Sequence, residues 1–186
     1  MPKPSGKGIL GPAFAIHSLS HPVKEPLQYT VKPVYWHATQ STIRDIRTKV
    51  FVEEQGVPSD LEWDGLDELA YHVIAYAPND RPIGTGRLLQ DGQIGRLAVL
   101  KEWRGKGVGK AILNMLLVIA NKMGYAKVKL HAQIRVVGFY RHRGFKKEGK
   151  QFIEAGIPHV AMTRTTADQT TWPAVFPAGV AQSERR

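Results

Sequence analysis

The chain has 186 residues and a formal net charge of +10, from 26 lysines and arginines against 16 aspartates and glutamates. This length favours a single domain that buries a sizeable core. The sequence contains no cysteine, which excludes disulfides, thiolate metal sites and an acyl-cysteine intermediate and favours a reducing compartment. No apolar run reaches the length of a membrane span and no secretory signal is recognisable, so we expect a cytoplasmic protein without a membrane partner.

Both ends of the chain differ from its middle. Residues 1–33 hold six of the twelve prolines and predict an extended arm ahead of a folded domain over residues 34–166. Residues 167–186 predict a tail. Because Trp172 and Phe176 in this tail can fold onto the domain or onto a second copy of the chain, we consider a homodimer.

Within the domain the hydrophobic pattern alternates between strand and helix periods. It predicts a strand at 34–36, a helix from a cap at Ser41 or Thr42 to about Phe51, an acidic loop at 55–67, and strands at 70–77, 83–89 and 93–100. A long amphipathic helix follows from Gly107 to Met123, with Gly124 as its left-handed cap. The pattern then predicts a strand at 127–133, a short helix at 135–143, and strands at 145–152 and 160–164.

Three glycines in five residues lie just ahead of the long helix. The segment Arg104-Gly105-Lys106-Gly107-Val108-Gly109-Lys110 can curl without side-chain obstruction, so several N–H groups can point at one anion. The helix start and the three cations strengthen that preference. The dinucleotide fingerprint does not fit, because Lys110 occupies its third glycine position. The Walker A pattern fails at Arg104 and Ala111. The segment predicts a phosphate-binding loop of another kind.

The charges are unevenly distributed along the chain. Residues 101–150 contain thirteen lysines and arginines against two glutamates, whereas residues 41–80 contain nine acidic residues against three basic ones. The basic part suits a polyanionic ligand, and an acidic stretch near the same cleft would attract a cationic amine. Because the basic residues belong to a glycine loop and to helix ends, with no recognisable nucleic-acid module, we expect no nucleic-acid partner.

Several separated motifs resemble one known family. They are Arg104-x-x-Gly107-x-Gly109 after an apolar strand, Phe139-Tyr140-x-x-x-Gly144-Phe145, Val50-Phe51-Val52-Glu53-Glu54-Gln55-Gly56-Val57-Pro58, Ala132-Gln133, and Glu154-x-Gly156-Ile157-Pro158-His159. Together, from about Tyr35 to Arg164, they resemble the GCN5-related N-acetyltransferases, and more closely their ElaA/YjcF-type branch. The resemblance implies an α/β (α+β) fold with a mixed, mostly antiparallel, twisted sheet, splayed central strands and flanking helices.

The resemblance also implies acetyl-CoA as co-substrate. The backbone of Leu97, Ala98 and Val99 would pair with the pantetheine arm and polarise the thioester. Residues Arg104, Gly105, Lys106, Gly107, Val108, Gly109 and Lys110 would take the pyrophosphate. Gln133 stands where the family commonly has asparagine, another side-chain amide that can reach pantetheine. Tyr140 is the expected general acid, because its hydroxyl can protonate a thiolate without carrying charge into an apolar site.

The general base stays open at this point. Glu54 follows the first predicted helix, His72 lies in the next strand, and His131 shares a strand face with Gln133, so each can collect the proton of an amine. The candidates for contacts to the acceptor are Glu53, Glu54, His131 and His159. No pair of histidines has metal-ligand spacing, and we expect no metal.

The favoured hypothesis is an N-acetyltransferase that moves acetyl from acetyl-CoA to the primary amine of a small molecule. Since the chain has no cysteine, we expect direct transfer in a ternary complex. Two alternatives remain: a non-catalytic module that binds coenzyme A or its acyl esters, and acetylation of a protein lysine or N-terminus.

Overall fold

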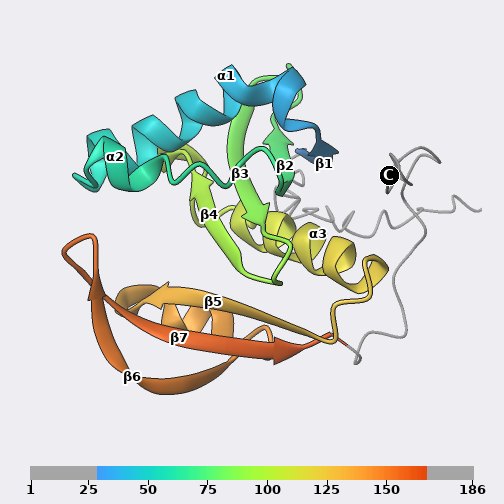
Figure 1. Ribbon diagram of the computed structural model, residues 1–186. Coiled ribbons are helices and arrows are strands. Elements are labelled where there is room, and N and C mark those ends of the chain that lie inside the picture. Colours follow the sequence, from blue (N-terminus) through green and yellow to red (C-terminus); the bar gives the residue numbers. More distant parts are fainter. Residues whose placement is uncertain (1–28, 167–186) are drawn as a thin grey trace, which may run out of the picture.

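The computed structural model describes residues 29–166, which form two antiparallel sheets with helices around them (Figure 1). The first sheet has the strand order β1-β2-β3-β4, with β1 at Thr30–Val34, β2 at Tyr71–Tyr76, β3 at Pro82–Leu88 and β4 at Ile94–Val99. The second has the order β5-β7-β6, with β5 at Lys127–Gln133, β6 at Lys146–Glu154 and β7 at Ile157–Thr165.

The two sheets are joined at one end of β4. A parallel bridge pairs Gln93 with Lys129, and the Lys129 amide donates to the carbonyl oxygen of Gly92 at 3.0 Å. Beyond that bridge β4 and β5 diverge (Figure 1). Their pairing runs no further, so the edge of β4 that faces β5 keeps backbone groups without a strand partner. The expected mixed sheet with splayed central strands is confirmed.

Helices cover both faces of the first sheet. The helical elements are α1 (Trp36–Arg47), the π-helical turn η1 (Thr48–Glu54), α2 (Ser59–Glu62), η2 (Lys101–Trp103), α3 (Val108–Lys122), η3 (Ile134–Val136) and α4 (Val137–Arg141). Buried Ile43 and Ile46 of α1 pack with Ile74 of β2 on one face, whereas Val73 of β2 packs with α3 on the other. This difference follows from the alternation of side chains along a strand.

Close packing of α3 against the sheet depends on two glycines of β3. A Cβ on Gly84 would lie 2.9 Å from Ile112 Cδ1, and a Cβ on Gly86 would lie 2.7 Å from Ile112 Cγ2. Since carbon atoms do not approach that closely, only glycine lets the helix sit at this distance. The packing fixes the start of α3 beside the end of β4.

Three predicted boundaries were wrong. The first strand begins at Thr30, inside the region expected as an arm, and α1 begins at Trp36, five residues before Ser41. The earlier start buries the Trp36 indole in the core beneath α1. The last strand begins at Ile157, because a two-residue turn places it directly after β6. Most of the expected arm, and the whole tail with Trp172 and Phe176 that led us to consider a homodimer, lie outside the described residues.

Candidate active site

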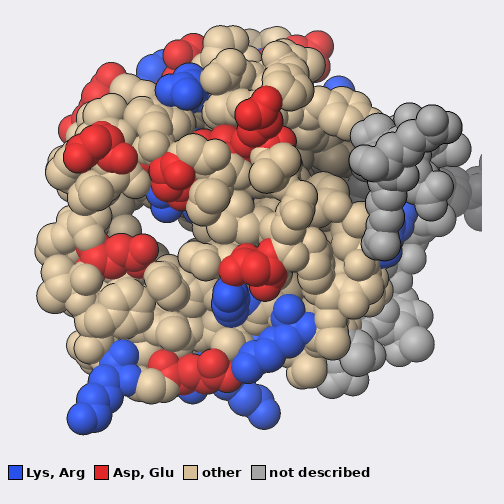
Figure 2. Space-filling model, viewed as in Figure 1, with Lys and Arg blue, Asp and Glu red and all other residues tan. Residues whose placement is uncertain are grey.

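A cavity of about 730 Å³ lies between β4 and the second sheet. Figure 2 shows this face of the molecule hollowed between its upper part, which carries α1 and α2, and the lower sheet. The walls include residues from the glycine loop, β4, η1, α4, β5 and the β6–β7 turn. The splay of the two sheets therefore creates a concave site large enough for a cofactor or small molecule.

A β-bulge shapes the wall that β4 supplies. Arg87 pairs with Gly95 and Thr85 with Ala98, so two residues of β4, Arg96 and Leu97, lie opposite one residue of β3. Arg96 has a φ of 50°, which is the left-handed backbone that such a bulge uses. The bulge decides which of the three residues expected to pair with pantetheine lie on the cavity wall. Leu97 and Val99 line the cavity, whereas the Ala98 side chain is fully buried on the α1 side.

The glycine loop follows β4 and leads into α3. Gly107 is the N-cap of α3 with a φ of 86°, and the first turn of the helix contains no acidic residue. Gly105, Gly107, Gly109 and Lys110 line the cavity. The first N–H groups of the helix have no intrahelical acceptor and lie at the positive end of its dipole. This end of the cavity is therefore suited to an anion.

Gly109 leaves room between the loop and α4. A Cβ at this position would lie 3.7 Å from side-chain atoms of Leu97 and Val99 and 3.8 Å from Phe139. A larger side chain would fill that space. The side chains of Val108 and Lys106 do not line the cavity. Val108 is buried in the core, and the Lys106 ammonium lies 5.2 Å from the centre of the Trp103 ring. From these two residues we therefore expect only backbone N–H groups to contribute to the anion site.

Arg104 does not offer a free guanidinium to a phosphate. Its two terminal nitrogens donate to the Glu54 carboxylate at 2.5 and 2.7 Å, and its Nε donates to the carbonyl oxygen of Val99 at 2.9 Å. This side chain lines the cavity and ties η1 to the end of β4, and its expected contact with pyrophosphate stays a prediction. The hydrogen bond from Arg104 lowers the pKa of Glu54, so Glu54 is also unsuited as a base. Glu53 is exposed and does not line the cavity.

Tyr140 lies on α4, with its ring edge-on to Phe139 and Phe145 at centroid distances of 4.9 and 5.9 Å. The residue lines the cavity. Burial raises its pKa to about 12, so the hydroxyl keeps its proton at neutral pH. Among residues 29–166 no group forms a hydrogen bond with this hydroxyl. It is available to donate to a bound molecule.

Gln133 reaches the cavity from the end of β5. Its Nε2 donates to Gln55 Oε1 at 2.9 Å, and its Oε1 accepts from Arg135 Nε at 2.8 Å. Gln55 is a cavity residue that sequence reasoning missed. The only sequence signal for it is its place in the motif around η1. The expected contact between Gln133 and pantetheine stays a prediction.

His72 lies outside the cavity, which corrects its assignment as a candidate base. The side chain is 1% exposed and stacks on Trp36 at a centroid distance of 5.2 Å. Its Nε2 donates to the carbonyl oxygen of Asp67 at 2.8 Å, and burial lowers its pKa. This histidine is a satisfied part of the core. Period-2 alternation places it on a buried face, because β2 is covered on both sides.

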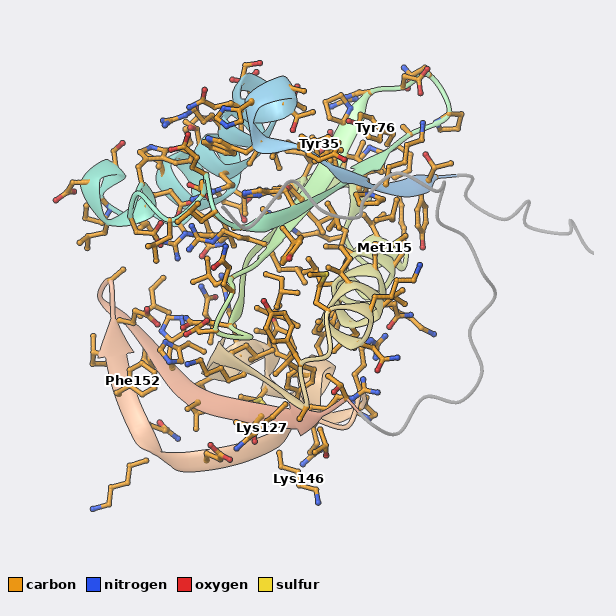
Figure 3. All side chains as sticks on the ribbon, turned by 45° about the vertical axis from the view of Figure 1, so that its right-hand side comes forward. Tyr35, Tyr76, Met115, Lys127, Lys146 and Phe152 are labelled. Atoms are coloured by element: carbon orange, nitrogen blue, oxygen red, sulfur yellow. The ribbon has the colours of Figure 1, made fainter. Side chains whose placement is uncertain are left out.

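The other two predicted histidines do line the cavity. His131 on β5 hydrogen-bonds through Nδ1 to Glu154 Oε2 on β6 at 2.9 Å, across the intervening strand β7. His159 on β7 donates from Nδ1 to the carbonyl oxygen of Ile157 at 2.7 Å. Phe152, labelled on the lower sheet in Figure 3, has its ring edge-on to His131 and stacked on His159.

The strand register explains why these residues meet. His131 pairs with Ala161, while His159 pairs with Gln133 on one side and with Phe152 on the other. Directly paired residues share a face of the sheet. Glu154, which sequence reasoning missed as a site residue, precedes a turn formed by Ala155 and Gly156 with φ values of 47° and 75°. Two positive φ angles are typical of a tight hairpin, and glycine is common in such turns. Gly156 was therefore the sequence feature that could have predicted this turn and the position of Glu154.

The wall opposite the histidines belongs to a buried ionic network. Arg47 donates to Glu62 Oε1 at 2.5 Å and to Asp67 Oδ1 at 2.6 Å, and Arg96 Nε lies 3.0 Å from Glu62 Oε2. Arg87 joins the same network through Asp64 and Asp67. Glu62 and Arg96 line the cavity with their charges paired to each other. Sequence reasoning missed both, because the network joins residues far apart in the chain.

Within residues 29–166 no group of three or more histidine, aspartate or glutamate side chains is arranged to hold a metal ion. No helix in the same range is long and apolar enough to cross a membrane.

Comparisons with known proteins agree with this geometry. A family model described as an acetyltransferase (GNAT) domain matches residues 39–166. YjcF of Bacillus subtilis (strain 168), described as an uncharacterised N-acetyltransferase, is 37% identical over 123 residues, which are 64% of this chain and 87% of YjcF. The crystal structure of Escherichia coli ElaA is 26% identical with a TM-score of 0.66 and covers 73% of this chain and 99% of ElaA. An acyl-CoA N-acyltransferase from Pseudomonas aeruginosa is 28% identical with a TM-score of 0.66, over 74% of this chain and 100% of that one.

Proposed function

The chain belongs to the GCN5-related N-acetyltransferase family and is an N-acetyltransferase, and from this premise we propose that its acceptor is the primary amine of a small molecule. The donor in the proposal is acetyl-CoA, the co-substrate of the family. One observation carries it: the unpaired edge of β4, the glycine loop and Tyr140 meet around one cavity. This combination suits an anionic, amide-containing thioester.

The donor half of the cavity fits coenzyme A group by group. The backbone of Leu97 and Val99 lies at the strand edge, where the amides of pantetheine can add as an extra strand. The N–H groups at the start of α3 would hold the pyrophosphate, together with Lys110. The missing side chain of Gly109 leaves the passage between these two parts open. Arg104 ties the loop to Glu54 at the edge of the same cavity.

Tyr140 supplies the proton donor near the thioester sulfur in this proposal. Its protonated hydroxyl has no other partner among the described residues. A donor in a half-buried site stabilises the charge that develops on a leaving thiolate. Because the sequence has no cysteine, the proposal is direct transfer from donor to amine with both bound at once.

The acceptor half of the cavity suits a small amine. Its apolar wall contains Phe51, Val57, Leu61 and Ile157, and its polar side contains His131, Glu154 and His159. The apolar residues would hold the carbon skeleton, while the Glu154 carboxylate favours a cationic ammonium group. The volume of the whole cavity, about 730 Å³, lies in the range of small-molecule sites, which supports a small molecule as acceptor.

The first experiment is a calorimetric titration of the full chain with acetyl-CoA, desulfo-CoA and ATP, followed by a thiol-release assay with 2-phenylethylamine, spermidine and glucosamine. Micromolar binding of both coenzyme A species with weak ATP binding, and thiol release with at least one amine, supports the proposal. Binding without thiol release favours a non-catalytic coenzyme A module or a protein acceptor. Failure to bind coenzyme A contradicts the donor site.

A further inference from the structure

We propose that His131 is the catalytic base that takes a proton from the acceptor ammonium, and that Glu154 is the positioning residue that orients it. The inference rests on the proposed function, since it names a role within the same cavity. Its basis is the contact at 2.9 Å between His131 Nδ1 and Glu154 Oε2, with both residues on the cavity wall.

The contact decides which nitrogen of His131 can act. An ionised carboxylate only accepts hydrogen bonds, so the neutral imidazole carries its proton on Nδ1 when it bonds to Glu154. Nε2 then holds the free lone pair. No group within the described residues hydrogen-bonds to that nitrogen. The His131 side chain is 39% exposed, so Nε2 can be reached from the cavity.

The other titratable groups near the acceptor lack one of these properties. The Glu54 carboxylate is bound twice by Arg104, and Glu62 is bound by Arg47 and Arg96. His72 lies in the core, as described above. His159 is on the wall, but it is nearly buried and its Nδ1 bonds to a neutral carbonyl. A base must take up positive charge, and only His131 has a carboxylate that offsets it.

The strand pairing makes the arrangement rigid. His131 lies within β5, and the turn at Ala155 and Gly156 fixes Glu154 at the end of β6. The Phe152 ring packs edge-on against the imidazole at 4.9 Å. A base held by a carboxylate on one side and an aromatic ring on another keeps one orientation, which a proton transfer requires.

The acceptor ammonium gives one proton to His131 Nε2, and the electron pair left on nitrogen forms the new C–N bond to the acetyl carbonyl carbon. The C–S bond breaks and its electron pair leaves with sulfur. Sulfur takes a proton from the Tyr140 hydroxyl as the same oxygen receives the second proton lost by the nitrogen, so that no phenolate forms. His131 returns its proton to solvent.

The test compares a nucleophile that must lose a proton before it can attack with one that is already neutral. An alkylamine such as 2-phenylethylamine is cationic at neutral pH, whereas O-benzylhydroxylamine, which has the same shape, is uncharged. We expect His131→Gln to lower kcat/KM by about 100-fold with the alkylamine and by about threefold or less with the alkoxyamine. The deficit with the alkylamine shrinks as the pH rises, because solvent then supplies the free amine.

Lys129→Gln is the matched control. Lys129 lies on the same strand and face, is paired with Asp91, and does not line the cavity, so this variant keeps wild-type kinetics. Equal loss by His131→Gln with both nucleophiles, or no loss with either, overturns the inference while leaving the proposed function intact. Absence of transfer by the wild-type chain to any amine overturns the proposed function and the inference with it.

Glu154→Ala tests the positioning role through the same pair of nucleophiles. Loss of the carboxylate removes the acceptor that holds the His131 proton on Nδ1, so kcat/KM falls with the alkylamine and changes by about threefold or less with the alkoxyamine. Glu154→Gln keeps an oxygen that can accept from Nδ1 and restores part of the lost activity. Equal loss with both nucleophiles in Glu154→Ala, or no loss with either, overturns the positioning role.

Discussion

Tyr140 shows how burial sets the chemistry of a single residue. Its raised pKa of about 12 makes the hydroxyl a weaker acid than a thiol, for which the reference pKa is about 8.5. Full proton transfer to a free thiolate is therefore uphill. Donation of a hydrogen bond to sulfur while negative charge develops is favourable, and it leaves no phenolate in an apolar site. We infer that Tyr140 acts early, as the C–S bond lengthens.

From this we predict that Tyr140→Phe lowers kcat by about 100-fold and changes the acetyl-CoA dissociation constant by about twofold or less. The ring and its packing against Phe139 and Phe145 remain, and only the donor is lost. Turnover comes from thiol release and affinity from calorimetry. Tyr76→Phe is the control, because Tyr76 on β2 is also partly buried but does not line the cavity (Figure 3). Equal turnover by wild type and Tyr140→Phe contradicts the role.

At the scale of elements, the junction of β4, the loop and α3 depends on glycines for two different reasons. Gly107 has a left-handed backbone, so any side chain there strains the turn itself. Gly109 has ordinary helical backbone, and what it provides is empty space next to Leu97 and Phe139. A substitution at Gly109 therefore tests the ligand site without distorting the loop.

We predict that Gly109→Glu raises the acetyl-CoA dissociation constant by about 100-fold or more, which corresponds to about 2.8 kcal/mol. The new carboxylate would fill the passage and repel the pyrophosphate. Titration calorimetry measures the change. The control is Asn114→Glu, which adds the same charge to the same helix at a position away from the cavity wall. Unchanged affinity in Gly109→Glu would show that coenzyme A does not lie against this loop.

At the scale of the whole molecule, the buried ionic network joins parts of the chain that are far apart in sequence. Arg47 at the end of α1 holds Glu62 of α2 and Asp67 ahead of β2, while Arg96 connects Glu62 to the bulge of β4. The segment that forms the acceptor-side wall is thus held by ion pairs as well as by apolar packing. Such pairs add specificity but leave costly unpaired charges when one partner is removed.

We predict that Arg47→Met lowers the free energy of unfolding by about 3 kcal/mol, because Glu62 and Asp67 lose a buried cation at once. Urea unfolding followed by circular dichroism measures the difference. Arg81→Ala is the control: its ion pair with Glu102 has both side chains more than half exposed, so it changes stability by about 0.5 kcal/mol or less. A loss below about 1 kcal/mol in Arg47→Met contradicts a structural role for the network.

The sequence by itself determined the features that depend on neighbouring residues. Alternation in residues 127–133, the apolar run in residues 70–77, the helical spacing after Gly107, and the glycine loop all arise from local backbone preferences, and these elements lie close to where they were predicted. The order of the elements together with the motifs also led to the correct family. The starts of α1 and β7 were missed, because burial of Trp36 and a turn at Ala155 override local signals.

Only the tertiary structure decided which charged side chains meet. Arg104 pairs with Glu54, which lies fifty residues earlier, and His131 reaches Glu154 across a third strand. His72 is buried because helices cover both faces of its sheet. These outcomes depend on strand register and on which elements pack together, and no local spacing contains that information. For this reason the sequence was enough to predict the phosphate-binding loop, whereas one candidate base could be chosen among the three only from the folded structure.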